Sequence, residues 1–188
     1  CAIAAGRMNR SVRSAKPYST NSSEDPTVSN EPQNMPADFE SALGYLMGVT
    51  KPTINDFKLM AYVEAGGEAF YIGLANASPT PEIAELLTKN GREERAHAHR
   101  VKRVIEKLSG ESFEVPEPAD NPYYVIPEGL TVDAEMLNGL IEGELGGDAL
   151  YQGWAATLDD SECATLLSQN GKEEIRHGDR CKQALALL

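Results

Sequence analysis

Cysteine is scarce in this sequence, and the few cysteines are not paired. There are three in 188 residues, and no two are spaced as CxxC: Cys1, Cys163 and Cys181. A disulfide framework, a zinc ribbon and an iron site with four thiolate ligands are therefore excluded on ligand count. Histidine is equally scarce, so any metal site that uses imidazole must draw on three residues: His97, His99 and His177.

Positive charge and long apolar runs are also in short supply. The chain has 17 Lys and Arg against 29 Asp and Glu, which gives a formal net charge of -12 and a pI of about 4.7. This balance argues against binding to nucleic acid or to an anionic membrane surface, because both need basic patches. No apolar run approaches the ~20 residues of a membrane-spanning helix. Hydrophobic residues nevertheless make up 41% of the chain, enough for one packed domain.

The N-terminal residues differ from the rest in composition. Residues 1–36 are rich in Ser, Asn and Pro, and we expect them to form a flexible tail. Within this tail, residues 1–23 carry four basic residues and no acid, which is compatible with an organellar transit peptide for a mitochondrion or plastid. Without such a signal the protein is expected to be cytoplasmic. Residues 37–52 are predicted to form a short helix and a linker, and residues 53–188 a helical bundle.

Four long helical segments are expected in the bundle, at about 53–77, 80–108, 131–158 and 160–188. Pro81 and Gly110 suit the start and the end of the second segment. The other helix starts are expected to be capped by polar residues: Asn55 or Asp56, Thr131 or Asp133, and Asp160 or Ser161. Short connections make two antiparallel hairpins, and the proline-containing run between them is long enough to cross the length of a bundle. The sequence therefore predicts an all-α four-helix bundle of two hairpins joined by a long crossover.

The two predicted hairpins resemble each other in sequence. When residues 60–102 are aligned with residues 140–182 without a gap, 18 of the 43 pairs are identical. The shared positions are not mainly the apolar ones that a common amphipathic pattern would produce. This internal repeat at an offset of 80 residues predicts a hairpin that was duplicated and packed against its copy across a pseudo-two-fold axis.

The repeat brings glutamates and histidines into a pattern suited to metal binding. Residues three apart on a helix share a face, so Glu94 and His97 project together, as do their counterparts 80 residues later. A symmetric bundle would bring six side chains inward at one level: Glu64, Glu94, His97, Glu144, Glu174 and His177. Four buried carboxylates cost several kcal/mol each unless cations compensate them. Two divalent ions match that charge, and oxygen with imidazole ligands favours iron, with manganese as an alternative.

Other repeated residues are candidates for supporting roles. Gly67 and Gly147 lie three residues after a ligand glutamate and would leave room beside the metals. The residues expected to assist catalysis are Glu68, Asp148, Tyr71 and Tyr151. The tyrosines are candidates for hydrogen bonds to the ligand carboxylates, whereas Glu68 and Asp148 could hold a histidine N–H, serve as a movable extra ligand or relay protons. His99 falls off this face and is expected to be exposed.

These motifs resemble the rubrerythrin-like branch of the ferritin-like di-iron carboxylate superfamily. The resemblance covers about residues 53–188 and rests on the four glutamates, the two histidines and the two tyrosines named above. It implies an oxidoreductase that reduces hydrogen peroxide or dioxygen with electrons from a rubredoxin-like or flavoprotein-like donor, and a homodimer is expected. Two features depart from the family pattern: Gly147 stands where a further glutamate is usual, and the chain has no rubredoxin domain.

Two other functions share the same ligand plan. One is an oxygen-dependent di-iron hydroxylase of the quinone-biosynthesis type, although such proteins resemble membrane-surface enzymes and this chain is acidic and polar. The other is iron oxidation for storage or delivery, as in ferritins. Spacing of the ligands alone does not distinguish these alternatives from peroxide reduction.

Overall fold

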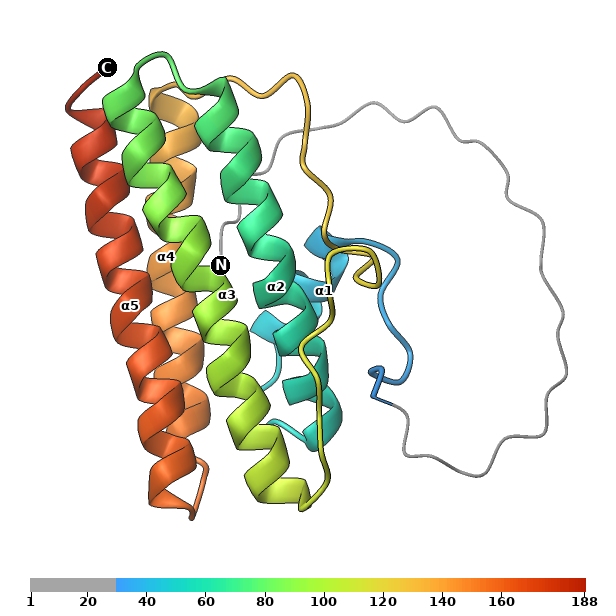
Figure 1. Ribbon diagram of the computed structural model, residues 1–188. Coiled ribbons are helices and arrows are strands. Elements are labelled where there is room, and N and C mark those ends of the chain that lie inside the picture. The colour runs from blue at the N-terminus through green and yellow to red at the C-terminus, as the bar shows by residue number, and fades with distance from the viewer. Residues whose placement is uncertain (1–29) are drawn as a thin grey trace, which may run out of the picture.

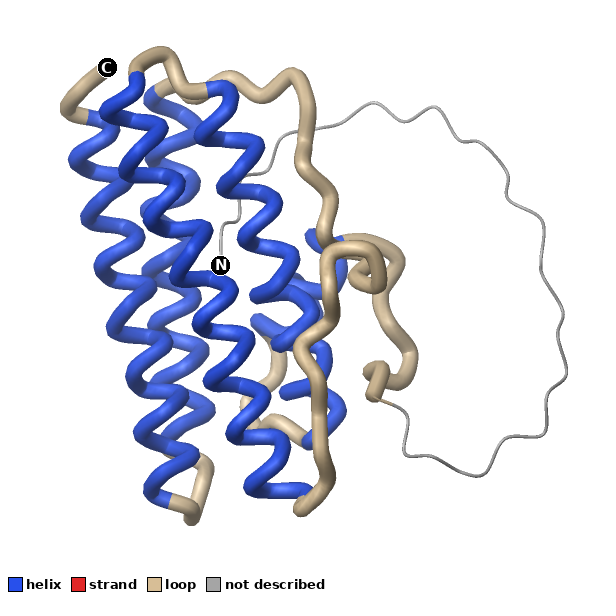
Figure 2. The backbone as a smooth tube through the Cα atoms, in the orientation of Figure 1, coloured by secondary structure: helices blue, strands red, loops and turns tan. Residues whose placement is uncertain are grey.

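The computed structural model describes residues 30–188, and all regular structure in this range is helical (Figures 1 and 2). There are five helices and no strand among these residues. The helices are α1 (Phe39–Met47), α2 (Ile54–Ala77), α3 (Pro81–Ser109), α4 (Ala134–Ala155) and α5 (Ser161–Leu185). The predicted all-α fold is confirmed. The proposed transit peptide at residues 1–23 and most of the predicted tail lie outside the described residues, and the division of the chain into tail, linker and bundle stays a prediction.

The helix starts follow the local sequence, with one difference from expectation. Helix α2 begins after Thr53, not at a cap formed by Asn55 or Asp56. The Thr53 side chain accepts a hydrogen bond from the backbone N–H of Asp56, and the Asp56 carboxylate accepts one from the backbone N–H of Thr53 at 2.7 Å. This reciprocal capping box satisfies two N–H groups at once, which explains why Thr53 is the cap and not Asn55 or Asp56.

The remaining ends match the predicted signals closely. Thr80 caps α3 ahead of Pro81, and Gly110 ends it with a φ of 73°, a left-handed conformation that glycine adopts without strain. Asp133 caps α4 and Asp160 caps α5, each by accepting a backbone N–H from three residues on. Short connections therefore join α2 to α3 and α4 to α5 as two antiparallel hairpins, which is the ferritin-like connectivity predicted above.

The connection between the hairpins runs along the outside of α2 (Figure 1). Two glycines of α2 make this close approach possible. A Cβ at Gly66 would lie 2.8 Å from the carbonyl oxygen of Tyr123, and a Cβ at Gly73 would lie 2.6 Å from Pro127 Cδ. The Asn121 side chain then ties the crossover to the helix by donating to the Tyr62 carbonyl at 2.9 Å. The crossover is thus a packed layer against one face of the bundle.

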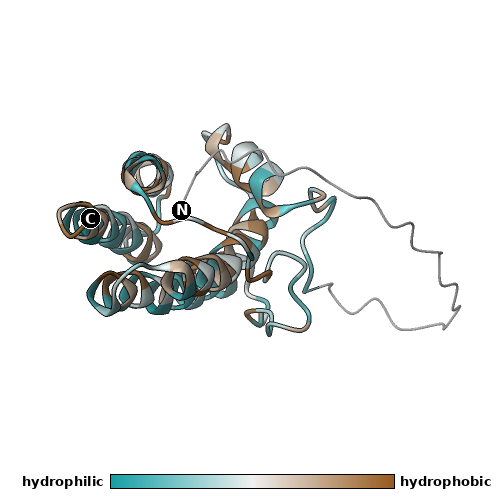
Figure 3. Cartoon of the chain, turned by 90° about the horizontal axis from the view of Figure 1, so that it is seen from above, coloured by the Kyte–Doolittle hydropathy of each residue, from teal (hydrophilic) through white to brown (hydrophobic). Residues whose placement is uncertain are grey.

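Seen from the end of the bundle, the long helices surround a common interior, with α1 and the crossover outside it (Figure 3). The two hairpins meet where α3 packs against α5, and α1 packs against α2. Two large apolar clusters and a third one of three small residues fill the interior. One large cluster includes Phe57 and Trp154 near one end of the bundle, and the other includes Leu74 and Leu137 near the opposite end. The buried polar residues of the repeat come between the two large clusters.

Candidate metal centre

Six predicted ligand residues come together in the middle of the bundle. They form two overlapping groups, and each has one ligand atom per residue within 4.8 Å of the others. The first group contains Glu64, Glu94, His97 and Glu174, and the second contains Glu94, Glu144, Glu174 and His177. All six side chains are at most 1% exposed. One residue comes from each of α2 and α4, and two come from each of α3 and α5.

Each histidine faces three carboxylates through the same ring atom. His97 Nδ1 lies 3.5 Å from Glu64 Oε2, 3.7 Å from Glu94 Oε2 and 3.3 Å from Glu174 Oε1. His177 Nδ1 lies 3.3 Å from Glu94 Oε1, 3.5 Å from Glu144 Oε2 and 3.3 Å from Glu174 Oε2. Glu94 and Glu174 therefore turn one oxygen toward each histidine, whereas Glu64 and Glu144 serve one histidine each.

This donor set fits a pair of metal ions. Both Nδ1 atoms are buried and make no hydrogen bond, although the other nitrogen of each ring does. Two ligands about 2.1 Å from one ion are about 3.0 to 3.4 Å apart at octahedral or tetrahedral angles, close to the separations seen here. Carboxylate oxygen with imidazole is a donor set suited to iron or manganese. The shared carboxylates place the two candidate positions next to each other.

Without cations, protons must supply the positive charge that the cluster needs. Burial, together with the charges of Glu174 and Glu64, raises the pKa of Glu94 to about 8. Burial alone would lower the pKa of His97, but the surrounding carboxylates outweigh it and hold this pKa well above the usual value. The same balance raises the pKa of His177. The metal-free cluster therefore retains protons that divalent ions would displace.

Two tyrosines reach the cluster from opposite hairpins. The Tyr71 hydroxyl on α2 donates to Glu144 Oε1, and the Tyr151 hydroxyl on α4 donates to Glu64 Oε1. Both rings are buried, and burial raises the pKa of each hydroxyl well above its usual value. The predicted contacts between these tyrosines and the ligand carboxylates are present, and each hydroxyl stays protonated as a donor.

The outer nitrogen of each histidine is held by a glutamate that the sequence analysis did not single out. His97 Nε2 lies 3.1 Å from Glu173 Oε2, and His177 Nε2 lies 3.1 Å from Glu93 Oε2. A carboxylate oxygen accepts, so Nε2 carries the proton and Nδ1 points into the cluster. A signal was available: both copies of the repeat contain a Glu-Glu pair, Glu93-Glu94 and Glu173-Glu174, of which only the second member was predicted to have a role.

The family comparison agrees with this arrangement. A scan against protein-family models matches the model described as Rubrerythrin over residues 60–185. The chain belongs to the rubrerythrin family. Searches of curated proteins and of solved structures gave no significant match. The matched range contains all six cluster residues, and the family belongs to the ferritin-like di-iron superfamily, so a di-iron site at this cluster is the reading that family and structure support together.

The idea that Glu68 or Asp148 holds a histidine N–H in this rubrerythrin-family chain is wrong. Glu68 Oε2 lies 3.7 Å from Arg95 Nη1, and Asp148 accepts a hydrogen bond from Gln152 Nε2 at 3.0 Å. Four residues span 400° of helical turn, so both side chains are rotated by about 40° from the preceding ligand glutamate and are half-buried at the side of the bundle. The role of Glu68 and Asp148 as proton relays stays a prediction, and neither contact described here reaches a cluster residue.

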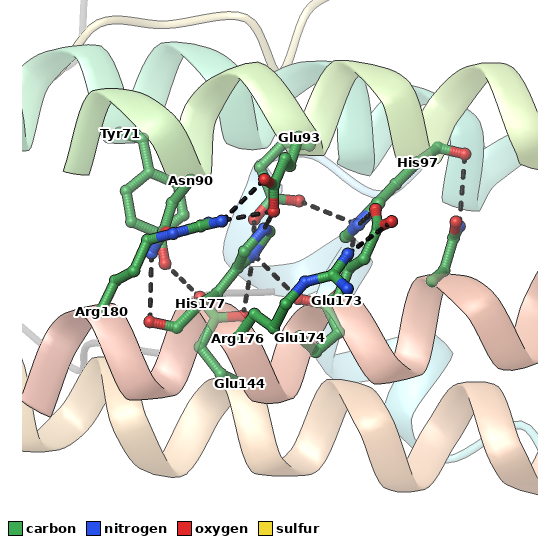
Figure 4. Close-up of polar contacts among 12 residues, drawn as sticks. Tyr71, Asn90, Glu93, His97, Glu144, Glu173, Glu174, Arg176, His177 and Arg180 are labelled. Atoms are coloured by element: carbon green, nitrogen blue, oxygen red, sulfur yellow. Dashed lines mark hydrogen bonds and ion pairs between the residues drawn. The ribbon is translucent and has the colours of Figure 1, made fainter. Parts of the chain in front are cut away.

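Arginines and asparagines complete the surroundings. Arg100 donates to Glu173 at 2.7 and 3.0 Å, and Arg180 donates to Glu93 at 2.9 and 2.7 Å. Each arginine also donates to an asparagine whose own amide donates to a histidine carbonyl: Asn170 to that of His97 and Asn90 to that of His177. These hydrogen bonds cross between α3 and α5, so they fix the two histidine-bearing helices against each other. Figure 4 shows those that Arg180 and Asn90 make.

Glycines of the repeated motifs keep the helices close to the cluster. A Cβ at Gly67 would lie 3.3 Å from Glu94 Cδ, so this glycine faces the site as predicted. Gly91 and Gly171 follow the two asparagines, and a Cβ there would lie 3.0 Å from Tyr71 Cβ and 3.2 Å from Tyr151 Cβ. The Asn-Gly pair therefore serves two purposes: the amide holds a histidine carbonyl, and the glycine lets the tyrosine-bearing helix approach.

Of the remaining thiol and imidazole groups in residues 30–188, only Cys181 lies near the cluster, where Asn90 Nδ2 donates to its Sγ at 3.7 Å. His99 is exposed, as expected, and Cys163 and Cys181 are buried free thiols. Burial raises the pKa of Cys163 to about 11 and that of Cys181 to about 12. No helix among residues 30–188 is long and apolar enough to cross a membrane.

The buried thiols give a simple test of the packing. Because a thiol reacts as its thiolate and both pKa values lie above 10, Cys163 and Cys181 should react with a disulfide reagent such as DTNB far more slowly at pH 8 than free cysteine does. A Cys1→Ser variant isolates the two, and its reaction in guanidinium chloride serves as the unfolded control. Equal rates in native and unfolded protein would contradict the buried placement.

Proposed function

We propose that this protein is a di-iron oxidoreductase that reduces hydrogen peroxide to water with electrons from an external donor. The observation that supports this most is the pair of glutamates, Glu94 and Glu174, that turn one oxygen toward each histidine. Adjacent metal positions with shared carboxylates suit a reaction that needs two electrons at one place. Peroxide reduction consumes two electrons and two protons and yields two waters.

The ligands are assigned in two groups. Glu64 and His97 would hold one iron, Glu144 and His177 would hold the other, and Glu94 and Glu174 belong to both groups. When bound, the two irons supply one electron each together with Lewis acidity. The same donor set also suits manganese, so manganese at one of the two positions is the alternative.

The surrounding residues of this chain orient the ligands. Glu173 and Glu93 accept the outer N–H of each histidine and so select the tautomer that aims Nδ1 at the metals. Tyr71 and Tyr151 donate to the outward oxygens of Glu144 and Glu64, which leaves the other oxygen of each facing a histidine. The missing side chain at Gly67 lets α2 lie close against Glu94, because a Cβ there would be 3.3 Å from Glu94 Cδ and 3.4 Å from Glu94 Oε2.

The electron donor is expected to be a separate protein of the rubredoxin-like or flavoprotein-like class. With three cysteines the chain cannot provide the four thiolates of a rubredoxin iron site. A homodimer and the cellular compartment stay predictions. Two surface grooves, one between α4 and α5 and one between α3 and α5, are lined by no cluster residue.

The proposal is tested by loading the purified chain with ferrous iron under anaerobic conditions. We expect two irons per chain by elemental analysis, and in stopped-flow absorption faster oxidation by hydrogen peroxide than by dioxygen. The matched variants are His97→Ala and His99→Ala, because one removes a buried imidazole of the cluster and the other an exposed one two residues away. The first should lose iron and peroxide reactivity, and the second should keep both. Faster oxidation by dioxygen, or a large iron-filled particle in gel filtration, would favour hydroxylase or storage chemistry instead.

A further inference from the structure

The six cluster residues are matched in pairs 80 positions apart, but their surroundings are matched only in part. The pairs extend outward through Glu173 and Glu93, through Arg100 and Arg180, and through the two asparagines, with equivalent contacts at each step. Among the residues that contact these two glutamates, the equivalence fails at Arg176. The residue 80 positions earlier is Ala96.

Arg176 changes how firmly one histidine is held. Arg176 Nη2 lies 2.7 Å from Glu173 Oε1. Glu173 therefore contacts two guanidinium groups, those of Arg176 and Arg100, as well as His97. Glu93 has one guanidinium, from Arg180, and His177. The exposure of the two carboxylates differs accordingly: the Glu173 side chain is 8% exposed and the Glu93 side chain 31% exposed. Figure 4 shows Arg176 and Arg180 rising from α5 toward these two glutamates.

We propose that the two halves of the centre release metal at different rates, with the half containing His177 and Glu144 as the labile one and Arg176 as the residue that locks the other. This inference rests on the proposed function, because it concerns the two metals assigned there. Arg176 touches no ligand of the cluster and acts through Glu173 on the orientation of His97, so it is a positioning residue.

The physical reason is the fate of each histidine when it turns away from the metal. A metal leaves when a ligand rotates and water takes its place, and the hydrogen bond on the outer nitrogen opposes that rotation. For His97 the acceptor is a nearly dry carboxylate fixed by charge-assisted bonds to Arg100 and Arg176. For His177 the acceptor is open to water, which competes for its oxygens. The His177 half should therefore lose its metal first and fill last.

The test follows metal release in the chain loaded with two cobalt(II) ions, whose visible absorption reports bound metal and which do not cycle with oxygen under these conditions. Mixed with excess EDTA, the native chain should lose cobalt in two phases of equal amplitude. The rates should differ about tenfold or more, the usual size of such outer hydrogen-bond effects.

Three variants assign the phases. Arg176→Ala should accelerate the slow phase only, because it gives Glu173 the environment of Glu93. Ala96→Arg places a guanidinium three residues after Glu93, as Arg176 lies three residues after Glu173, and should slow the fast phase only. The double exchange should restore two well-separated phases. Arg103→Ala, which removes an exposed arginine bonded to Glu162, is the control and should change neither phase.

The outcomes separate this inference from the proposed function. Binding of two cobalt ions with release in one phase, unaffected by Arg176→Ala, would overturn the inequivalence and leave the bimetallic site standing. Acceleration of the fast phase by Arg176→Ala would show that lability had been assigned to the wrong half, and would also overturn it. Failure of the native chain to bind two ions would overturn the proposed function itself.

Discussion

Replacing Glu94 by glutamine is expected to abolish binding of the metal pair while making the metal-free protein more stable. Glu94 turns one oxygen toward each histidine, at 3.7 Å from His97 Nδ1 and 3.3 Å from His177 Nδ1, so both metal positions lose a ligand. The amide keeps the shape of the side chain and cannot ionise, so the folded chain no longer has to take up a proton to avoid a charge that burial and the other carboxylates oppose. A substitution that weakens metal binding but stabilises the metal-free protein indicates a carboxylate that is retained for function and not for stability.

The gain in stability has a defined pH window. The pKa of Glu94 is raised to about 8 by burial and by neighbouring carboxylates, whereas the unfolded chain has the ordinary value near 4.5. Between these values the folded carboxyl holds a proton that the unfolded one has released, so the native chain loses stability as the pH rises from 4.5 toward 8. The metal-free Glu94→Gln variant should therefore gain about 1 to 3 kcal/mol in free energy of unfolding at pH 7.5, and the gain should vanish near pH 4.5.

The measurement is thermal or urea unfolding of EDTA-treated protein, paired with elemental analysis after reloading with ferrous iron. Glu85→Gln is the matched control, because Glu85 lies on the same helix with a side chain that is 70% exposed. It should leave the iron content and the metal-free stability unchanged. A Glu94→Gln variant that still binds two irons, or that is less stable than the native chain without metal, would contradict the assignment.

Replacing Trp154 by alanine is expected to lower the free energy of unfolding by about 3 to 5 kcal/mol, the cost of removing a large aromatic side chain from a close-packed core. The indole is 1% exposed and meets Phe57 edge to face, with ring centroids 5.4 Å apart. Its N–H donates to the Val49 carbonyl at 2.7 Å, which joins the end of α4 to the segment between α1 and α2. The substitution would leave a cavity and a carbonyl without its donor.

Urea unfolding followed by far-ultraviolet circular dichroism measures this loss, since the variant lacks the single tryptophan of the chain. Trp154→Phe is the matched comparison. It keeps an aromatic ring against Phe57 but has no N–H for Val49, so it should lose about 1 to 2 kcal/mol and still bind two irons. If alanine and phenylalanine cost the same, the ring would contribute nothing beyond the hydrogen bond, and the packing account would be wrong.

The sequence by itself determined the helices, the hairpins and the six cluster residues. These are local properties, because a helix brings residues three apart onto one face, caps act within one turn, and a short connection makes an antiparallel pair. Pro81, Gly110 and Asp133 mark ends that the structure places where they were expected. Glu94 and His97 needed only helical geometry to be brought together. The cap of α2 shows the limit of local prediction. Asn55 or Asp56 was expected to cap this helix, but the cap is Thr53.

Only the tertiary structure decided what holds the histidines. Glu93 is next to Glu94 in sequence, but successive helical residues differ by 100° in direction, so it points across to α5 and not into the centre. Its partner there is His177, and this depends on how α3 and α5 are rotated and shifted against each other, which no single helix specifies. The same packing leaves Glu68 at the side of the bundle and sets Arg176 against Glu173. The spacing of residues along each helix was thus enough to predict the six cluster residues. The residues that hydrogen-bond to them depend on contacts between helices far apart in the chain.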